Sequence, residues 1–558
     1  MSALAAALPQ PTPAQLARGI AGAVPAELSK SPLLGILGVV MGAGVVTLTS
    51  RMISLGLADF KGHQGFGYDE SAWIGTAFDV GLMFIGPFTV YLGGLMGPRR
   101  ILLTSAAMFT LLMMFLPFIH NYALVIVAVG LGGLTSGTFY PLTLTFALRN
   151  IPIRYLPFTI ALYASFVDGA VNIAPSLYGW YRDHLSWQWM FWNSALITPL
   201  MMLCIYFGIP KSPPAKEHHE APSFAGFLYA SAGFALVLAA CEQGERLDWW
   251  RSGVFNALFA SGSFLLIAAL VRRLRGANPL VDMPYLRQRN TILLGCGLFF
   301  FRFFLVTTII LIPQTLALHG FEPDQIGPAV VWTAVSFVPL SIVAGFLLIS
   351  NVDTRLLLAT GFASIAFASI LNAQMTSAWA APDYYRTEFL LGFGQCFAFI
   401  GLVSAIILQA LFSGALVKPQ RVLTFSAYFH TIRLFGGTLG AVLTGRFIAE
   451  REKFHSNLLG LHVQQGSWIT DGNIRQLTAG AFAKSSGLGQ AAGRAVDIVG
   501  ARLRLQAYTL SLNDAFYLVA WVCVIALVFV AFMRTEPMNY GDVSAIQQDL
   551  GRSKGVTT

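Results

Sequence analysis

The sequence predicts an all-α membrane protein with fourteen transmembrane helices, and two observations lead to this prediction. First, only 11% of the 558 residues are charged, while 56% are hydrophobic and the mean hydropathy is +0.66; soluble chains carry about 25% charged residues. Second, the chain contains fourteen apolar stretches that are long enough to cross a hydrocarbon layer, which takes about 20 helical residues. This composition excludes a soluble, disordered or nucleic-acid-binding protein.

The fourteen stretches are continuous apolar runs, and most are joined by short polar connections. They lack the strict alternation of apolar and polar residues that marks transmembrane strands. In chain order, the predicted helices cover residues 33–57, 72–96, 101–118, 122–148, 156–178, 188–209, 224–242, 253–271, 291–314, 326–349, 356–373, 388–412, 422–448 and 514–533.

Basic residues are concentrated in alternate connections, as expected when insertion retains them on the cytoplasmic side. If the amino terminus is placed on the cytoplasmic side, the cytoplasmic segments hold 19 Lys and Arg, and the short outer loops hold 5. Segment 450–512 is left out, because long loops escape the rule. Both termini are therefore predicted to be cytoplasmic, with an even number of spans. The outer residues are Lys61, Arg182, Arg246, Arg251 and Arg386.

Three segments outside the spans have distinct character. Residues 1–32 lack a basic amino-terminal region, which predicts a cytoplasmic tail and not a cleaved signal. Segment 210–223 is rich in Pro and charge, and it marks a boundary after six spans. Segment 450–512 contains helix-compatible pieces and is expected outside the membrane, without predicted chemistry.

Two ionisable residues are predicted to pair in the outer half of the membrane. Arg51 lies about 27 Å along the first span, and Asp79 lies at nearly the same depth in the second span, which runs back. A charge in lipid costs roughly 2.5 kcal/mol or more, so we expect an ion pair. The pair either only ties two helices together, or acts as a switch in which protonation of Asp79 releases Arg51.

Asp168, Arg302 and Arg433 are predicted about 17 Å from the inner ends of three different spans. Three charges at one level indicate a water-filled site near the midplane, where transporters place substrates and coupling ions. His430 lies one helical turn before Arg433 and can face the same side. It either contacts a substrate or is a structural hydrogen-bonding residue. Glu242 lies nearer the outer end of the seventh span.

Sequence motifs of enzymes and of ATP-driven pumps are absent. The chain has no GxxxxGK[ST] loop, no HExxH and no GxSxG set, and the Ser and His residues of the spans form no recognisable catalytic constellation. The five cysteines lie singly in apolar runs without metal-ligand spacing. We therefore expect no enzymatic activity, no cofactor and no metal.

Several motifs carry a family resemblance. CEQGERLDWWRS (241–252) resembles the pattern LDRGxxxDWFxS, and NPLVDMPYLRQRN (278–290) resembles NPxVDLxLFxxRNF. SAWIGTAF (71–78), IPQTL (312–316) and RLFGGTLG (433–440) give weaker support. From about Leu33 onward the chain is similar to the EmrB/QacA-like, fourteen-span drug/proton antiporter branch of the major facilitator superfamily.

The resemblance implies a major facilitator fold, with two six-helix bundles around a central cavity and two helices inserted between them. The cavity-forming helices would carry Arg51, Asp79, Asp168, Arg302, His430 and Arg433, and an inserted helix would carry Glu242. The implied organisation is a cytoplasmic tail (1–32), an N-terminal bundle (33–209), a cytoplasmic linker (210–223), two inserted helices (224–271), a second cytoplasmic linker (272–290), a C-terminal bundle (291–533) that includes a long periplasmic loop (450–512), and a cytoplasmic tail (534–558).

The sequence departs from the family pattern at positions that the family uses for proton coupling and gating. The family's first-span aspartate falls at Thr49, the acidic position of its loop motif GxLaDrxGRR falls at Gly94, and its fourth-span arginine falls near Val129. The fifth-span GPxxGG is reduced to APSLYG (174–179).

Other parts of the pattern remain. The gating-loop motif, here VYLGGLMGPRR, keeps Gly97, Arg99 and Arg100. Either Asp79, Asp168 and Arg51 have taken over the coupling roles, or coupling is altered.

The predicted function is proton-coupled export of an amphipathic organic compound across the cytoplasmic (inner) membrane by alternating access. Asp168 is the first candidate for the coupling carboxylate and Asp79 the second, and the excess of arginine at Arg302 and Arg433 favours a neutral or anionic substrate. Two alternatives stay open: an uptake or lipid/fatty-acid transporter on the same fold, and a non-transporting membrane sensor or assembly factor. In a source with two membranes, the resemblance also implies a periplasmic membrane-fusion adaptor and an outer-membrane channel.

Overall fold

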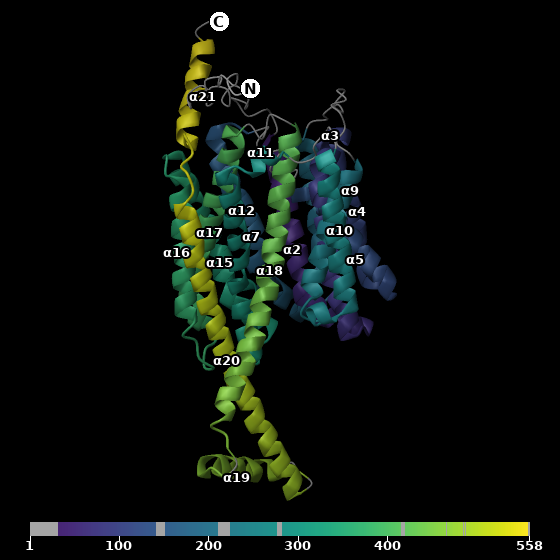
Figure 1. Cartoon of the computed structure of the whole chain (residues 1–558), viewed down its shortest axis with the longest axis vertical. Helices are drawn as coiled ribbons and strands as arrows, with labels where there is room; N and C mark the ends of the chain where they lie inside the picture. The colour runs from purple at the N-terminus through teal and green to yellow at the C-terminus, as the bar shows by residue number, and fades with distance from the viewer. Residues whose placement is uncertain are drawn as a thin grey trace.

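The computed structural model describes residues 32–140, 151–209, 224–275, 282–413, 419–464, 466–483, 485 and 487–555, and all regular structure in these ranges is helical. Figure 1 shows long helices packed side by side, and two of them project far beyond the rest. The main helices are α2 (Pro32–Gln64), α3 (Tyr68–Met96), α4 (Pro98–Phe115), α5 (Tyr122–Ser136), α7 (Leu156–His184), α8 (Trp189–Gly208), α9 (Phe224–Gln243), α10 (Gly253–Arg275), α11 (Met283–Leu286), α12 (Arg289–Phe304), α13 (Ile312–Leu318), α14 (Pro323–Ile326), α15 (Pro328–Ile349), α16 (Thr354–Asn372), α17 (Ala381–Phe412), α18 (Pro419–Gly460), α19 (Trp468–Phe482), α20 (Leu488–Ala531) and α21 (Tyr540–Gly555).

Thirteen helical segments in the described ranges are long and apolar enough to cross a membrane. The fourth expected span is described only in part: α5 ends at Ser136, and residues 141–150 lie outside the described ranges. The predicted all-α membrane fold is confirmed, and the predicted count of fourteen spans agrees with the described helices.

Two hydrophobic cores divide most of the helices into two groups. The N-terminal group consists of α2, α3, α4, α5, α7 and α8, with Phe78 and Phe109 in its core. The C-terminal group consists of α12, α13, α15, α16, α17, α18 and α20, with Phe304 and Phe362 in its core. Helices α9 and α10 pack against each other, and α9 also contacts α3 and α18.

The two groups meet along α7 with α15 and along α3 with α18. On the first seam, Ser165 Oγ donates to Ser341 Oγ at 3.0 Å, and the rings of Phe158 and Phe346 lie 5.1 Å apart between centroids. We call the end of the molecule at which α21 lies the terminal end (Figure 1), and the opposite end, beyond which α18 and α20 project, the distal end.

The ninth predicted span is not one continuous α-helix. α12 ends at Phe304, a π-helical turn follows at Thr307–Leu311, and α13 starts with Pro313 in its first turn. A π-helical turn inserts a residue into the regular ladder and is often found at functional sites. Here it presents the carbonyl of Ile309 to the N-terminal group, as described below.

The predicted long loop 450–512 is largely helical. α18 has 42 residues and α20 has 44, so they are about 63 Å and 66 Å long, roughly twice the hydrocarbon thickness. Figure 1 shows α19 at the tip of this pair, away from the other helices. Near its base, Arg451 and His455 of α18 contact the carboxylate of Asp514 on α20 at 2.6 and 2.7 Å. We call residues 450–512 the projecting arm.

The segment after α20 docks on the terminal end. Tyr540 is buried, and its hydroxyl donates to the carbonyl of Ser404 on α17 at 2.9 Å. Asn290 Nδ2, at the start of α12, donates to Glu536 Oε1 at 3.0 Å, and burial raises the pKa of this carboxyl. Helix α21 is therefore fixed to the C-terminal group.

Candidate functional site

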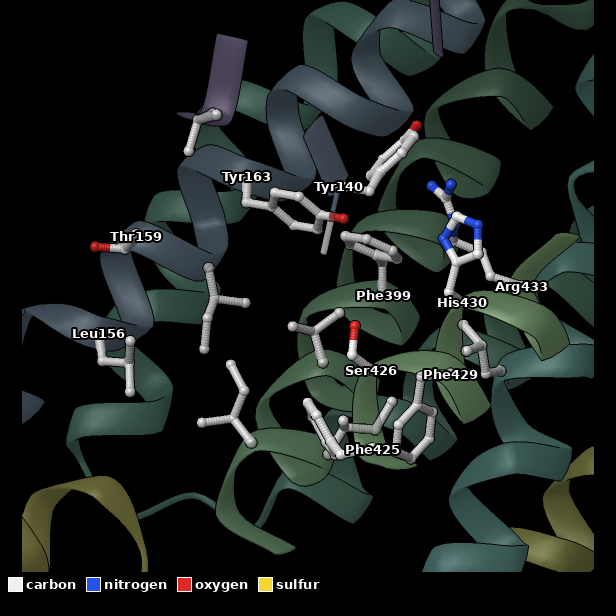
Figure 2. A pocket seen from close by; sticks show the side chains of 16 residues that line it. Tyr140, Leu156, Thr159, Tyr163, Phe399, Phe425, Ser426, Phe429, His430 and Arg433 are labelled. Carbon is white, nitrogen blue, oxygen red and sulfur yellow. The ribbon is translucent and has the colours of Figure 1, made fainter. Parts of the chain in front are cut away.

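A cavity of about 120 Å³ lies between the two helix groups (Figure 2). Leu156, the first residue of α7, and Phe425, in the second turn of α18, line its terminal side, and Arg433 lines its deep side. Arg433 is eight residues beyond Phe425, which is about 12 Å along α18. The lining is Val40, Tyr140, Leu156, Thr159, Ile160, Tyr163, Leu298, Phe399, Val403, Ile406, Ile407, Phe425, Ser426, Phe429, His430 and Arg433.

The deep side of the cavity carries Arg433 and His430, and the polar residues toward its terminal side are Thr159 and Ser426. The guanidinium carbon of Arg433 lies 3.4 Å from the ring centroid of Tyr140, and the Tyr140 hydroxyl is hydrogen-bonded to Thr47 Oγ1. His430 Nε2 lies 3.3 Å from the carbonyl oxygen of Leu82 on α3. Figure 2 shows Tyr140, His430 and Arg433 close together above apolar side chains. The cavity therefore has an amphipathic lining.

Asp168 lies on α7 and is completely buried, and it does not line this cavity. Its carboxylate is within electrostatic range of Arg302 on α12 and Arg433 on α18. Among the described residues, neither of its carboxylate oxygens has a hydrogen-bond partner. Of the three charges predicted at one depth, the structure places all in mutual electrostatic range, but only Arg433 lines the cavity.

A polar bridge that the sequence analysis missed joins the two groups beside Asp168. Asn172 Nδ2 donates to Gln395 Oε1 at 3.1 Å, and Gln395 Nε2 donates to Thr308 Oγ1 at 3.2 Å. Asn172 also donates to the carbonyl of Asp168, one turn earlier, at 3.0 Å. An amide within an apolar span is a usable signal for such a bridge, and Asn172 and Gln395 both carry one.

The predicted ion pair between Arg51 and Asp79 is wrong. Arg51 Nη2 donates to the carbonyl of Ile309 in the π-helical turn at 2.8 Å, and no ion pair within the described ranges joins it to Asp79. Asp79 instead faces α9, where its carboxyl group is a hydrogen-bonding neighbour of Glu242. Depth along a helix gives the height of a residue but not its direction around the axis, and these two side chains point to different neighbours.

The distal end is closed by contacts between α7 and the start of the tenth span. Arg182 Nη1 lies 3.0 Å from Glu322 Oε2, and Nη2 lies 3.8 Å from Asp324 Oδ1. The backbones also approach closely, because a Cβ built on Gly179 would lie 2.7 Å from the Cα of Asp324. The two groups are therefore in contact on the distal side of the cavity.

Glu388 is a further buried carboxyl that the sequence analysis missed. It is fully buried on α17, and Thr333 Oγ1 of α15 donates a hydrogen bond to it. The predicted span began at residue 388, which made this glutamate a boundary residue, whereas α17 begins at Ala381. An earlier helix start thus brings Glu388 inside the bundle.

The residues of the gating-loop motif lie at the turn between α3 and α4. Gly97 has φ +87°, a left-handed conformation that favours glycine. The guanidinium of Arg99 lies 4.5 Å from the ring centroid of Tyr206 on α8, and Arg100 is exposed. The gating role of these residues stays a prediction.

Comparison with known proteins defines the class. The model of the Major Facilitator Superfamily matches residues 39–441, so the chain belongs to this superfamily and is a multi-pass membrane protein. It is 23% identical over 547 residues to the probable multidrug resistance protein EmrY of Escherichia coli (strain K12), covering 95% of this chain and 98% of that protein. It is 22% identical over 497 residues to the multidrug export protein EmrB of the same strain, covering 87% and 92%.

These relatives confirm the resemblance to an EmrB-like branch of the superfamily. A solved structure of the proton:xylose symporter XylE superimposes with a TM-score of 0.55 at 11% identity, covering 93% of this chain and all of that one. At this identity the likeness shows the fold alone.

Proposed function

We propose that this protein is a proton-coupled exporter of amphipathic organic compounds that works by alternating access. The observation that carries the proposal is the cavity between the two helix groups, which is lined mainly by apolar side chains toward its terminal side and by Arg433 on its deep side. The names of EmrY and EmrB, which describe multidrug resistance and export, support the same direction of transport.

We further propose that the terminal end faces the cytoplasm, because 19 basic residues lie in the segments assigned to that side and 5 in the short loops of the other. The cavity extends toward the terminal end, and the distal end is closed by Arg182 with Glu322. In this orientation the structure is the inward-facing state. Residues 33–209 and 291–533 would then be the two moving bundles, with 224–271 as the inserted helices.

Asp168 is our first candidate for the coupling group. It belongs to one helix group, and the two arginines in its electrostatic range belong to the other. An ionised Asp168 attracts these arginines across the interface and a protonated one does not, so its protonation changes the interaction between the groups. Asp79 and Arg51 are weaker candidates, because the switch proposed for them requires the ion pair that the structure lacks.

We expect Arg433→Ala to weaken export of anionic amphipathic compounds by about tenfold or more, and that of cationic compounds by less than about twofold. Arg433 is the arginine that lines the cavity, so its loss removes the positive charge nearest to a bound compound. Transport of matched anionic and cationic dyes into vesicles measures this difference. Lys453→Ala is the control, because Lys453 is an exposed cation of the same helix, on the projecting arm and away from the cavity. Equal loss for both dyes would contradict a preference for neutral or anionic compounds.

The test of the proposed function is transport by the purified protein in proteoliposomes with an imposed pH gradient and a mixed library of amphipathic compounds. We expect compounds to move toward the more acidic compartment and to stop when a protonophore collapses the gradient. Movement in the same direction as the protons would identify an uptake transporter. Absence of any coupled movement would favour a membrane sensor or assembly factor.

We also propose that a periplasmic adaptor, with an outer-membrane channel beyond it, docks on the projecting arm. The arm carries exposed apolar side chains outside the membrane, including Leu461, Trp468 and Leu488. The second candidate role for this segment is that of a mobile cover over the cavity mouth. It has less support, because α19 lies at the tip and away from the bundle (Figure 1).

A further inference from the structure

The distal end of the inserted helix α9 contacts both helix groups. On one side, Gln243 Nε2 donates to Thr76 Oγ1 at 2.7 Å and to the carbonyl of Ala72 at 3.0 Å, and both acceptors lie on α3. On the other side, Thr438 Oγ1 of α18 donates to Glu242 Oε1 at 3.3 Å. Helix α3 belongs to the N-terminal group and α18 to the C-terminal group, so α9 bridges them.

The residues just after α9 extend this bridge at the surface. Arg246 Nη1 lies 2.7 Å from Asp69 Oδ1 on α3, and Arg446 Nη1 of α18 lies 3.1 Å from Glu245 Oε1. Exposed ion pairs stabilise a structure little, so the buried contacts matter more for the energy. The pairs nevertheless show that one short segment, residues 242–246, holds α3 and α18. We call this segment and its partners on α3 and α18 the distal clasp.

The inner part of the distal clasp contains a pair of partly buried carboxyl groups. Asp79 of α3 and Glu242 of α9 are neighbours. Thr76, one turn before Asp79, accepts a hydrogen bond from Gln243, which follows Glu242, and Thr438 Oγ1 donates to Glu242 itself. Two carboxyl groups can form a hydrogen bond only when one of them carries a proton, and two ionised groups at this range repel each other.

The other titratable and charged groups around the pair are few. Arg302 of α12 and Arg433 of α18 are within electrostatic range of Asp79, and Cys241 is within range of Glu242. The arginines favour retention of one negative charge on the pair. One carboxylate and one carboxylic acid therefore match this environment.

We propose that the distal clasp binds one proton between Asp79 and Glu242, and that this proton stabilises the state in which α3 and α18 are joined at the distal end. Separation of the two helices breaks the contacts of Thr438 with Glu242 and of Arg446 with Glu245, and it admits more water to the carboxyl pair. Water stabilises a second negative charge, so the open state holds the proton less tightly than the closed state.

The sign of the pH effect follows from this difference. The closed state binds more protons than the open state, so lowering the pH shifts the equilibrium toward distal closure and raising it shifts the equilibrium toward opening. A proton taken up from the distal side thus favours return to the inward-facing state. This role for the inserted helices goes beyond the proposed function, which assigns coupling to Asp168.

The distance between the distal ends of α3 and α18 tests the proposal. Spin labels at Tyr68 and Phe454, which are both exposed, report this distance in the full-length protein in lipid nanodiscs after replacement of the native cysteines. We expect the ratio of open to closed protein to rise with pH, by up to about tenfold per pH unit for one linked proton. No transported compound is needed, so failure of the transport assay leaves this result interpretable.

Variants of Asp79 and Glu242 test whether this carboxyl pair causes the pH dependence of distal opening. In Glu242→Gln the amide supplies its own hydrogen to Asp79, so we expect the distal end to stay closed and the pH response to fall by more than about half. In Asp79→Asn the asparagine amide donates to Glu242, so we expect the same result. This variant replaces Glu242→Gln in the experiment if Glu242→Gln folds poorly. Glu245→Gln is the matched control, because it changes an exposed carboxylate of the same segment, and it should keep the full response. A smaller reduction in both carboxyl variants, or an equal reduction in the control, would overturn the proposal.

Discussion

Asp168→Asn is expected to reduce pH-gradient-driven transport by about 100-fold or more, while binding of the compound changes by only a few fold. The asparagine has nearly the same shape as the aspartate and the site is completely buried, so we expect the fold to be kept. What is lost is the only negative charge of α7 within electrostatic range of Arg302 and Arg433 among the described residues. Without it, a change of pH no longer alters the attraction between the groups at this level.

Two measurements on the same vesicles separate coupling from binding. Exchange of labelled for unlabelled compound without a gradient should continue in Asp168→Asn, and gradient-driven accumulation should be lost. Asp183→Asn is the control, because Asp183 lies near the distal end of the same helix and is partly exposed. Normal gradient-driven accumulation in Asp168→Asn would remove Asp168 from the coupling role.

Gly86→Ala is expected to lower transport by about tenfold or more, because the added methyl group prevents the close packing of α3 against α18. A Cβ on Gly86 would lie 2.0 Å from Nε2 and 2.1 Å from Cδ2 of His430. The imidazole is buried and lies against the carbonyl of Leu82, so it cannot move aside without losing this contact. Initial rates in vesicles with matched amounts of protein measure the effect.

A double-mutant cycle identifies the cause. In a His430→Ala background the imidazole is gone, and Gly86→Ala should then change the rate by less than about twofold. Gly75→Ala is the matched control on the same helix, because a Cβ there would have no neighbour within 4 Å. A tenfold loss that persists in the His430→Ala background would rule out the steric explanation.

The sequence predicted the helices better than their contacts. Hydropathy and charge placed the spans, because the thickness of the bilayer and the insertion machinery act on length and composition alone. Depth along each span also placed Asp168, Arg302 and Arg433 at one level. The directions of the side chains depend on how each helix is rotated against its neighbours, and a single sequence contains no record of that rotation. Arg51 and Asp79 were therefore paired by depth alone, and the structure gives each of them another partner.

The sequence analysis missed several polar contacts inside the bundle. Gln395 joins Asn172 to Thr308, and Thr333 donates to Glu388. A polar residue within an apolar span indicates that it has a partner, but the sequence does not show which residue that partner is. Glu242 was recognised only as an acidic residue near a helix end. Its contacts with α3 and α18 depend on where α9 lies beside the two groups, and the order of helices along the chain does not determine this position.

The length of α18 has a mechanical consequence. One continuous helix carries His430 and Arg433 beside the cavity and runs on to Gly460, outside the membrane. Gly460 is 27 residues beyond Arg433, or about 40 Å along the axis, so a 10° tilt pivoting at Arg433 would displace it sideways by about 7 Å. The helix therefore has the geometry of a lever, in which a small rotation beside the cavity becomes a larger sideways displacement at the end of the projecting arm.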